Sequence, residues 1–163
     1  MSKERLIQWI ALVANCVTIL GLALVIVQLQ QNRSLMRAQV RHELASTIVD
    51  LLNSTANNSQ LASVVRRAGV GEELTPDEQF QFRLRSNALL RYWEDVHYQY
   101  RLGLYDEVEY SRQKAAWKAT FASSVGLVKY WHEVRTLYSP LFASEIDGLL
   151  PPQADTQPSP PHP

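Results

Sequence analysis

Glu94 and His97 are the residues whose types and spacing come nearest to a metal site. A Glu-x-x-His pair presents a carboxylate and an imidazole from one helix to one metal, as in di-iron helical bundles. Such a centre needs a second Glu-x-x-His and further glutamates on facing helices. Neither His42 nor His132 has a glutamate three residues before it. We therefore expect no metal and no cofactor.

Two interpretations remain for the polar side chains around this pair. A candidate pocket for a polar ligand, as in a sensor or an enzyme, consists of Glu94, His97, Tyr98 and Arg101. In the other interpretation, charge pairs at i, i+3 and i, i+4 fix the register of one helix against its neighbours, and they involve Arg91, Glu94, Asp95, His97 and Arg101. The sequence favours the second interpretation and keeps the first as the alternative.

The sequence also lacks the motifs of other common catalytic and metal sites. The chain has no Gly-x-Ser-x-Gly, no glycine-rich phosphate loop and no His-Glu-x-x-His. Its single cysteine, Cys16, allows neither an internal disulfide nor a cysteine zinc site. The formal net charge is zero, so no bulk charge attracts nucleic acid. We expect a protein that acts by binding and not by catalysis.

An apolar segment precedes these residues in the chain. Residues 6–29 are mostly Leu, Ile, Val and Ala, and no charge occurs between Arg5 and Arg33. A bilayer core needs about 20 apolar residues in a helix. The segment is too long for a buried core helix, and it lacks the small-residue cleavage site of a signal peptide. The sequence predicts a transmembrane helix over residues 6–29, after a flank of residues 1–5.

Two polar residues within this segment, Asn15 and Thr18, are candidates for helix–helix contact. Their spacing places them near one helical face, and a polar side chain in lipid gains from a hydrogen bond to another helix. They predict self-association or docking on another membrane protein. The alternative is that Asn15 is tolerated in the membrane because its side chain bonds its own backbone or water.

Residues at both ends of the apolar segment predict its membrane interfaces. Trp9 lies near the first end, and Arg33, Arg37 and Arg41 recur every four residues beyond the second. Arginines beside an anionic leaflet stabilise the attachment by about 1 kcal/mol each. The alternative, which the sequence favours, is that the three arginines only determine the topology and form a solvated part of the helix. The narrow Lys/Arg bias favours a cytoplasmic location for the domain that follows.

Residues 30–150 predict an all-α domain, a small bundle of about five helices into which the membrane helix continues. The first helix should reach Leu52, where an Asn/Ser-rich run begins. Capping residues then start three helices, at Ser59, Thr75 and Asp106. The expected helices cover residues 60–68, 76–102, 106–122, 125–138 and 140–150. The final residues, 151–163, are rich in proline, and we expect a disordered tail.

Apolar periodicity predicts the core-facing residues of two helices. In the long helix the expected stripe is Phe82, Leu89, Trp93, Val96 and Tyr100. In the next helix it is Val108, Trp117 and Phe121.

Several motifs resemble a widespread group of uncharacterised bacterial membrane proteins. The motifs are Tyr92-Trp93-Glu94, His97-Tyr98-Gln99-Tyr100-Arg101, Gly103-Leu104-Tyr105-Asp106-Glu107, Tyr138-Ser139-Pro140-Leu141-Phe142 and the exit Leu29-Gln30-Gln31-Asn32-Arg33. The resemblance covers most of residues 6–150. It implies a bacterial inner-membrane location, a single span and a helical domain, and it assigns no activity and no functional residue.

Overall fold

The computed structural model describes residues 3–150 and confirms the all-α prediction. These residues form six α-helices and one 3-10 helix, and none of them lies in a strand. The chain divides into two compact units, Met1–His42 and Glu43–Pro163, which are described separately below. The predicted disordered tail, residues 151–163, lies outside the described residues.

Helix α1 runs from Lys3 to Ala56 without a break, so the predicted continuation of the apolar helix into the next segment is confirmed. It ends four residues later than expected. The hydroxyls of Ser54 and Thr55 both donate to the carbonyl of Leu51, at 2.9 and 3.2 Å. Serine and threonine that bond back to the preceding turn are compatible with a helix, so the Asn/Ser-rich run adds a turn before it breaks.

Helix α2, Ser59–Gly69, begins one residue after its cap. The cap is Asn58, whose side chain accepts a hydrogen bond from the Leu61 amide at 3.0 Å, in place of the predicted Ser59. The left-handed residue after the helix is Gly71, with φ of 80°. Glycine adopts this conformation without steric cost, so the chain can reverse its direction there.

Helix α3, Pro76–Arg101, begins after the predicted cap and ends one residue before the predicted end. Thr75 and Glu78 form the reciprocal capping box, with Thr75 N donating to the Glu78 carboxylate at 2.9 Å. Gly103 follows the helix with φ of 71°. Both signals are local, which explains why they could be read from the sequence.

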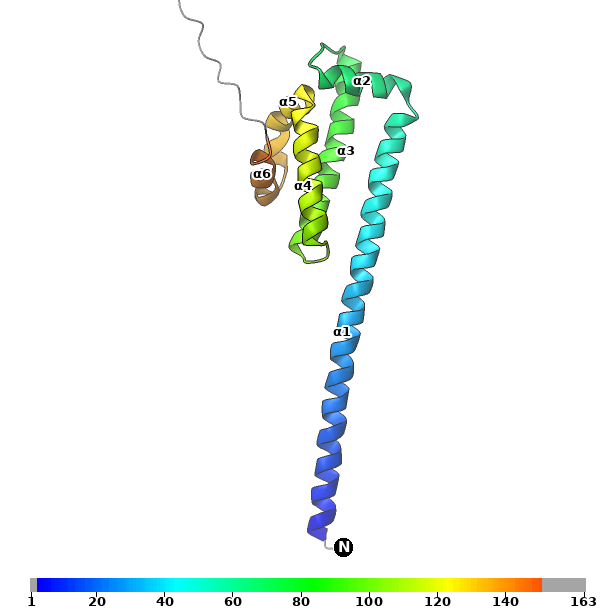
Figure 1. The fold of residues 1–163 in the computed structure, drawn as a ribbon, viewed down its shortest axis with the longest axis vertical. Helices are drawn as coiled ribbons and strands as arrows, with labels where there is room; N and C mark the ends of the chain where they lie inside the picture. The colour runs from blue at the N-terminus through cyan, green and yellow to red at the C-terminus, as the bar shows by residue number, and fades with distance from the viewer. Residues whose placement is uncertain (1–2, 151–163) are drawn as a thin grey trace, which may run out of the picture. The chain divides into compact units, whose positions relative to one another are not determined.

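Four shorter segments complete the second unit. Helix α4 is Glu107–Ala122, α5 is Val125–Val134, the 3-10 helix η1 is Arg135–Leu137 and α6 is Pro140–Asp147. Helix α3 contacts α2, α4 and α5 (Figure 1). The indole N–H of Trp131 donates to Asp147 at 2.9 Å, which fixes the end of α6 against α5.

Aromatic rings form the core of the second unit. The largest fully buried side chains are Trp117, Trp131, Phe121, Phe142, Leu90, Ile146, Val64 and Val96. Trp93 stacks on Trp117 with ring centroids 5.4 Å apart. Offset stacking and edge-to-face contacts of this kind stabilise a core beyond the area they bury.

Three expected core positions differ from the structure. Val108 is 60% exposed, because it lies on the opposite side of α4 from the buried Tyr110 and Trp117. In α3, Leu90 is fully buried, whereas Leu89 and Tyr100 are only half-buried. The buried face of α3 is therefore rotated slightly from the predicted stripe.

Candidate functional site

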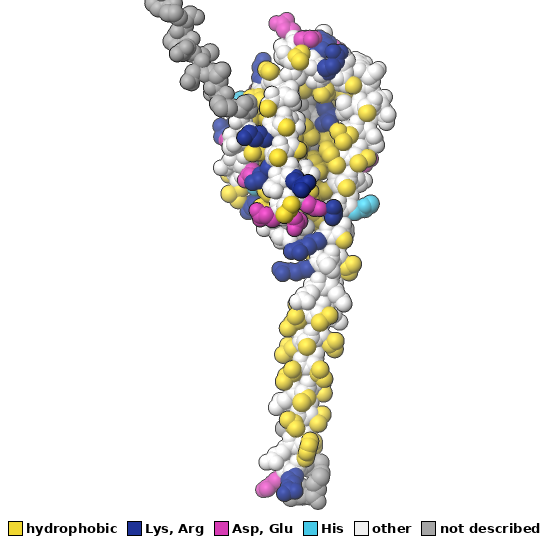
Figure 2. Space-filling view, viewed as in Figure 1, with side chains coloured by type: hydrophobic (Ala, Val, Ile, Leu, Met, Phe, Trp, Pro, Cys, Tyr) yellow, Lys and Arg dark blue, Asp and Glu magenta, His cyan; other side chains and the backbone are white. Residues whose placement is uncertain are grey.

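The apolar part of α1 is a helix long and apolar enough to cross a membrane. Its large apolar side chains from Ile7 to Leu29 are all exposed in the first unit, between 47% and 66%. Hydrophobic side chains cover this stretch in the view of Figure 2. Exposed apolar surface of this extent marks a site of contact with a membrane or with another protein.

Candidate interface residues lie on α1 at both ends of this apolar surface. Trp9 is 61% exposed near the first end, and Arg33, Arg37 and Arg41 are exposed beyond the second. Trp9 and Arg33 are 24 residues apart, which corresponds to about 36 Å of helix. This length exceeds the thickness of a bilayer core, which is about 30 Å.

The two polar candidates in the apolar segment have different surroundings. The Thr18 hydroxyl donates to the carbonyl of Ala14 at 3.0 Å, so its hydrogen bond is made within the helix. The Asn15 side chain is exposed on the helix surface. The two residues therefore differ, because the Thr18 hydroxyl is bonded within its own helix.

The structure places the four candidate pocket residues in different surroundings. His97 is buried, whereas Tyr98 beside it is 53% exposed, and Arg101 is also exposed. None of the four lines the groove described below. Their helical spacing predicted that they lie near one face of the helix. Neighbouring helices cover His97, however, and leave Tyr98 exposed.

The Glu94 carboxylate is bound on both oxygens. Arg91 donates to one oxygen at 2.7 Å, as the charge-pair interpretation predicted, and the backbone amide of Ser139 donates to the other at 2.8 Å. Burial raises the pKa of this carboxyl group, but the bonds from Ser139 and Arg91 outweigh burial and hold the pKa below its usual range. Glu94 therefore links α3 to the start of α6.

The His97 ring lies between two aromatic side chains of other helices. Its centroid is 6.2 Å from that of Tyr110 in α4 and 5.7 Å from that of Phe142 in α6. Burial lowers the pKa of the imidazole, because the charged form loses its hydration. His97 is therefore a core residue in which burial favours the neutral form of the imidazole.

Within residues 3–150, no group of three or more His, Cys, Asp or Glu side chains is placed to hold a metal ion. Glu94 and His97, the pair with metal-like spacing, are directed to different contacts, as described above.

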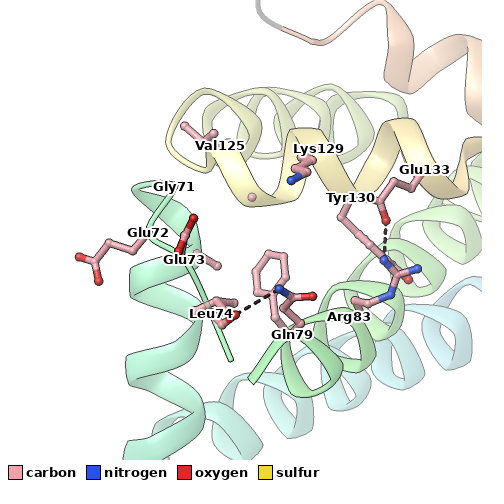
Figure 3. A pocket seen from close by; sticks show the side chains of 13 residues that line it. Gly71, Glu72, Glu73, Leu74, Gln79, Arg83, Val125, Lys129, Tyr130 and Glu133 are labelled. Carbon is pink, nitrogen blue, oxygen red and sulfur yellow. Dashed lines mark hydrogen bonds and ion pairs between the residues drawn. The ribbon is translucent and has the colours of Figure 1, made fainter. Parts of the chain in front are cut away.

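A groove that the sequence did not reveal lies in the second unit, between the α2–α3 loop and α5. It has a volume of about 660 Å³. Its lining consists of Ala68, Gly71, Glu72, Glu73, Leu74, Gln79, Phe82, Arg83, Val125, Gly126, Lys129, Tyr130 and Glu133 (Figure 3). The volume is within the range of about 300–1,000 Å³ that is typical of ligand sites.

The close crossing of α2 and α5 shapes one end of this groove. A Cβ added at Gly126 would lie 2.6 Å from the carbonyl oxygen of Ala68, so only glycine permits the approach. The other end carries an ion pair between Arg83 of α3 and Glu133 of α5. The guanidinium of Arg83 also lies 5.1 Å above the ring centre of Tyr130. The signal in the sequence was the glycine within a helix, whose packing role the sequence alone could not assign.

Comparison of the chain with protein-family models, with curated proteins and with solved structures finds no match. Residues 3–150 thus define an all-α protein with an exposed apolar stretch in α1 and a groove in the second unit.

Proposed function

We propose that this protein is a single-span, membrane-anchored helical binding module of a bacterial inner membrane, without catalytic activity of its own. The observation that carries the proposal is the apolar part of α1, which bears no charge from residue 6 to residue 32 and exposes its large side chains. In water this surface costs about 25 cal/mol for each Å². In lipid the cost disappears, and the helix satisfies its own backbone groups.

The residues around the span support an interfacial arrangement. Trp9 has the amphipathic ring that is enriched at headgroup level, and Arg33, Arg37 and Arg41 provide the cationic flank. We place the helical domain in the cytoplasm. A reporter enzyme fused after residue 163 tests this orientation: a reporter active only in the cytoplasm supports it, and one active only outside contradicts it.

Membrane fractionation tests the anchor. The full-length chain should remain in the membrane pellet after alkaline carbonate washing and should be released by detergent. A charged residue at a helix centre disfavours insertion by about 2.5–3.5 kcal/mol, so a Val17→Asp, Leu20→Arg variant should move to the soluble or aggregated fraction. Leu137→Arg, at a position 67% exposed in the second unit, is the matched control and should stay in the pellet. Recovery of the unaltered chain in solution without detergent contradicts the proposal.

The binding partner within the membrane is a second copy of the chain or another membrane helix. Asn15 supports this part of the proposal, because an exposed amide in lipid gains about 0.5–2 kcal/mol from an interhelical hydrogen bond. Native mass spectrometry in detergent should detect a dimer of the unaltered chain that is reduced in Asn15→Leu. Monomers in both samples count against self-association through this helix.

A further inference from the structure

Two charged side chains at the groove between the α2–α3 loop and α5 lack an ionic partner. Its other ionic side chains are paired: Arg83 with Glu133 and, at 3.1 Å, Arg67 with Glu72. Within residues 3–150, the Glu73 carboxylate and the Lys129 ammonium group make no ion pair. The groove thus presents one unpaired negative and one unpaired positive group.

We propose that this groove binds a short, extended peptide segment of a partner protein, which places a basic side chain against Glu73 and an acidic side chain against Lys129. The proposal rests on the proposed function of a binding module and names the class of its partner. Glu73 stands on the loop wall of the groove and Lys129 on the α5 wall, with Gln79 of α3 between these walls (Figure 3).

The backbone of the loop wall favours a peptide, and not a small ion, as the ligand of the groove. The carbonyl of Glu73 accepts from Arg67 at 2.8 Å, and the carbonyl of Leu74 accepts from the Gln79 side chain at 3.1 Å. The amides of Glu73 and Leu74 make no hydrogen bond to any residue that the structure describes. Unpaired main-chain donors in a non-helical segment suit the carbonyl groups of a peptide.

Apolar contacts complete the chemistry of the groove. Val125 is 62% exposed on the α5 wall, and Phe82 and Tyr130 line the groove with the small parts of their rings that remain accessible. A peptide that fits should therefore carry short apolar residues between its two charges. Successive side chains of an extended chain point to opposite sides, so charges an odd number of residues apart reach opposite walls.

Two labelled peptides test this geometry by fluorescence anisotropy with the full-length chain in detergent micelles. The probe is acetyl-Lys-Val-Val-Glu-amide, whose charges point to opposite sides. The control is acetyl-Lys-Val-Glu-Val-amide, which has the same composition but carries both charges on one side. We expect the probe to bind about tenfold more tightly than the control, a difference on the scale of one or two ionic contacts.

Charge reversal of the chain identifies the site. Glu73→Lys and Lys129→Glu should each weaken probe binding about tenfold, and the combined variant should recover most of it, because the peptide can bind in the reverse direction. Lys118→Glu, an exposed lysine of α4 outside the groove, is the matched control and should have no effect. Unchanged circular dichroism and thermal melting show that each variant is folded.

Three results overturn the peptide site: no saturable probe binding, equal binding of the two peptides, or binding that none of the groove variants alters. Any of them leaves the membrane anchor untouched, because carbonate fractionation measures the anchor without reference to the groove. Loss of the membrane anchor with retained probe binding would contradict the proposed anchor and support the peptide site.

Discussion

The carboxylate of Glu94 accepts a hydrogen bond at 2.8 Å from the backbone amide of Ser139, which lies 45 residues later in the chain. Ser139 is the N-cap residue of α6, and its own side chain makes no capping hydrogen bond there. A carboxylate supplied by α3 therefore satisfies an amide at the start of α6, where negative charge is also favoured by the helix dipole.

Removal of this contact should destabilise the second unit. Glu94→Ala leaves the Ser139 amide without its acceptor and removes the carboxylate that pairs with Arg91, so we expect a loss of about 1–3 kcal/mol in the free energy of unfolding. Glu94→Gln retains an acceptor oxygen and should cost less. Chemical denaturation of the full-length chain in detergent measures both. Equal stability of Glu94→Ala and the unaltered protein would show that the contact is dispensable.

A methyl group at Gly126 should also be destabilising. Alanine normally favours a helix over glycine by about 1 kcal/mol. Here the added Cβ would meet the Ala68 carbonyl at 2.6 Å, so α2 and α5 must separate. We expect a net loss of about 1–3 kcal/mol for Gly126→Ala, measured by the denaturation midpoint. Gly148→Ala, where the nearest atoms lie at 3.5 and 3.7 Å, is the control and should be nearly neutral.

Removing the hydroxyl groups of two stacked tyrosines should change the thermal stability of the second unit in opposite directions. The rings of Tyr100 and Tyr110 lie 3.9 Å apart at an interplanar angle of 7°. The Tyr100 hydroxyl donates to Glu107 at 2.7 Å, whereas the buried Tyr110 hydroxyl has no partner among the described residues.

Tyr110→Phe should therefore raise the thermal midpoint, because it removes an unsatisfied buried group that costs about 1–3 kcal/mol. Tyr100→Phe should lower the midpoint, because it breaks a hydrogen bond worth about 0.5–1.5 kcal/mol. Differential scanning calorimetry distinguishes the two. A lower midpoint for Tyr110→Phe would indicate that its hydroxyl group is satisfied, for example by water.

Burial of His97 makes the stability of the second unit depend on pH. Its pKa is lowered by burial, and the charges that act on it are those of Glu145, Arg101, Glu94 and Lys114. The unfolded chain then binds the proton more readily than the folded chain. Stability is complete above the unfolded pKa of about 6.5 and falls as pH decreases from there toward the folded pKa.

Thermal melts between pH 5 and 8 measure this effect. The unaltered protein should lose thermal stability below about pH 6.5, and His97→Phe should lack this part of the loss, since phenylalanine does not titrate. Glu94, whose pKa is also lowered, contributes only at more acidic pH. Parallel pH profiles for the two proteins would assign the dependence to another group.

Local signals made most of the fold predictable. The capping box of Thr75 and Glu78 lies within four residues, and the cap at Asp106 bonds amides two and three residues ahead. Such contacts depend on the sequence alone. The apolar part of α1 could be predicted for the same reason, because a long run without charges indicates a helix from its own sequence.

Tertiary contacts were harder to predict. His97 and Tyr98 are adjacent in sequence, but the positions of α4 and α6 decide that one is buried and the other exposed. The groove is lined by both Glu73 and Lys129, which are 56 residues apart in the sequence. Its shape depends on Gly126, which lets α5 approach Ala68. No period or motif in the sequence indicates which helices cross at which residue.

Cys16 provides the most direct measurement of membrane anchoring, because it is the single cysteine of the chain and lies in the apolar part of α1. Its side chain is exposed in the first unit, so only lipid or a partner helix can shield it. In broken-cell membranes, a polyethylene-glycol maleimide should leave Cys16 unmodified until detergent denatures the sample. On a Cys16→Ser background, the cysteine of a Lys118→Cys variant should react without detergent. Reaction of Cys16 in intact membranes as fast as the cysteine at position 118 would contradict the transmembrane assignment.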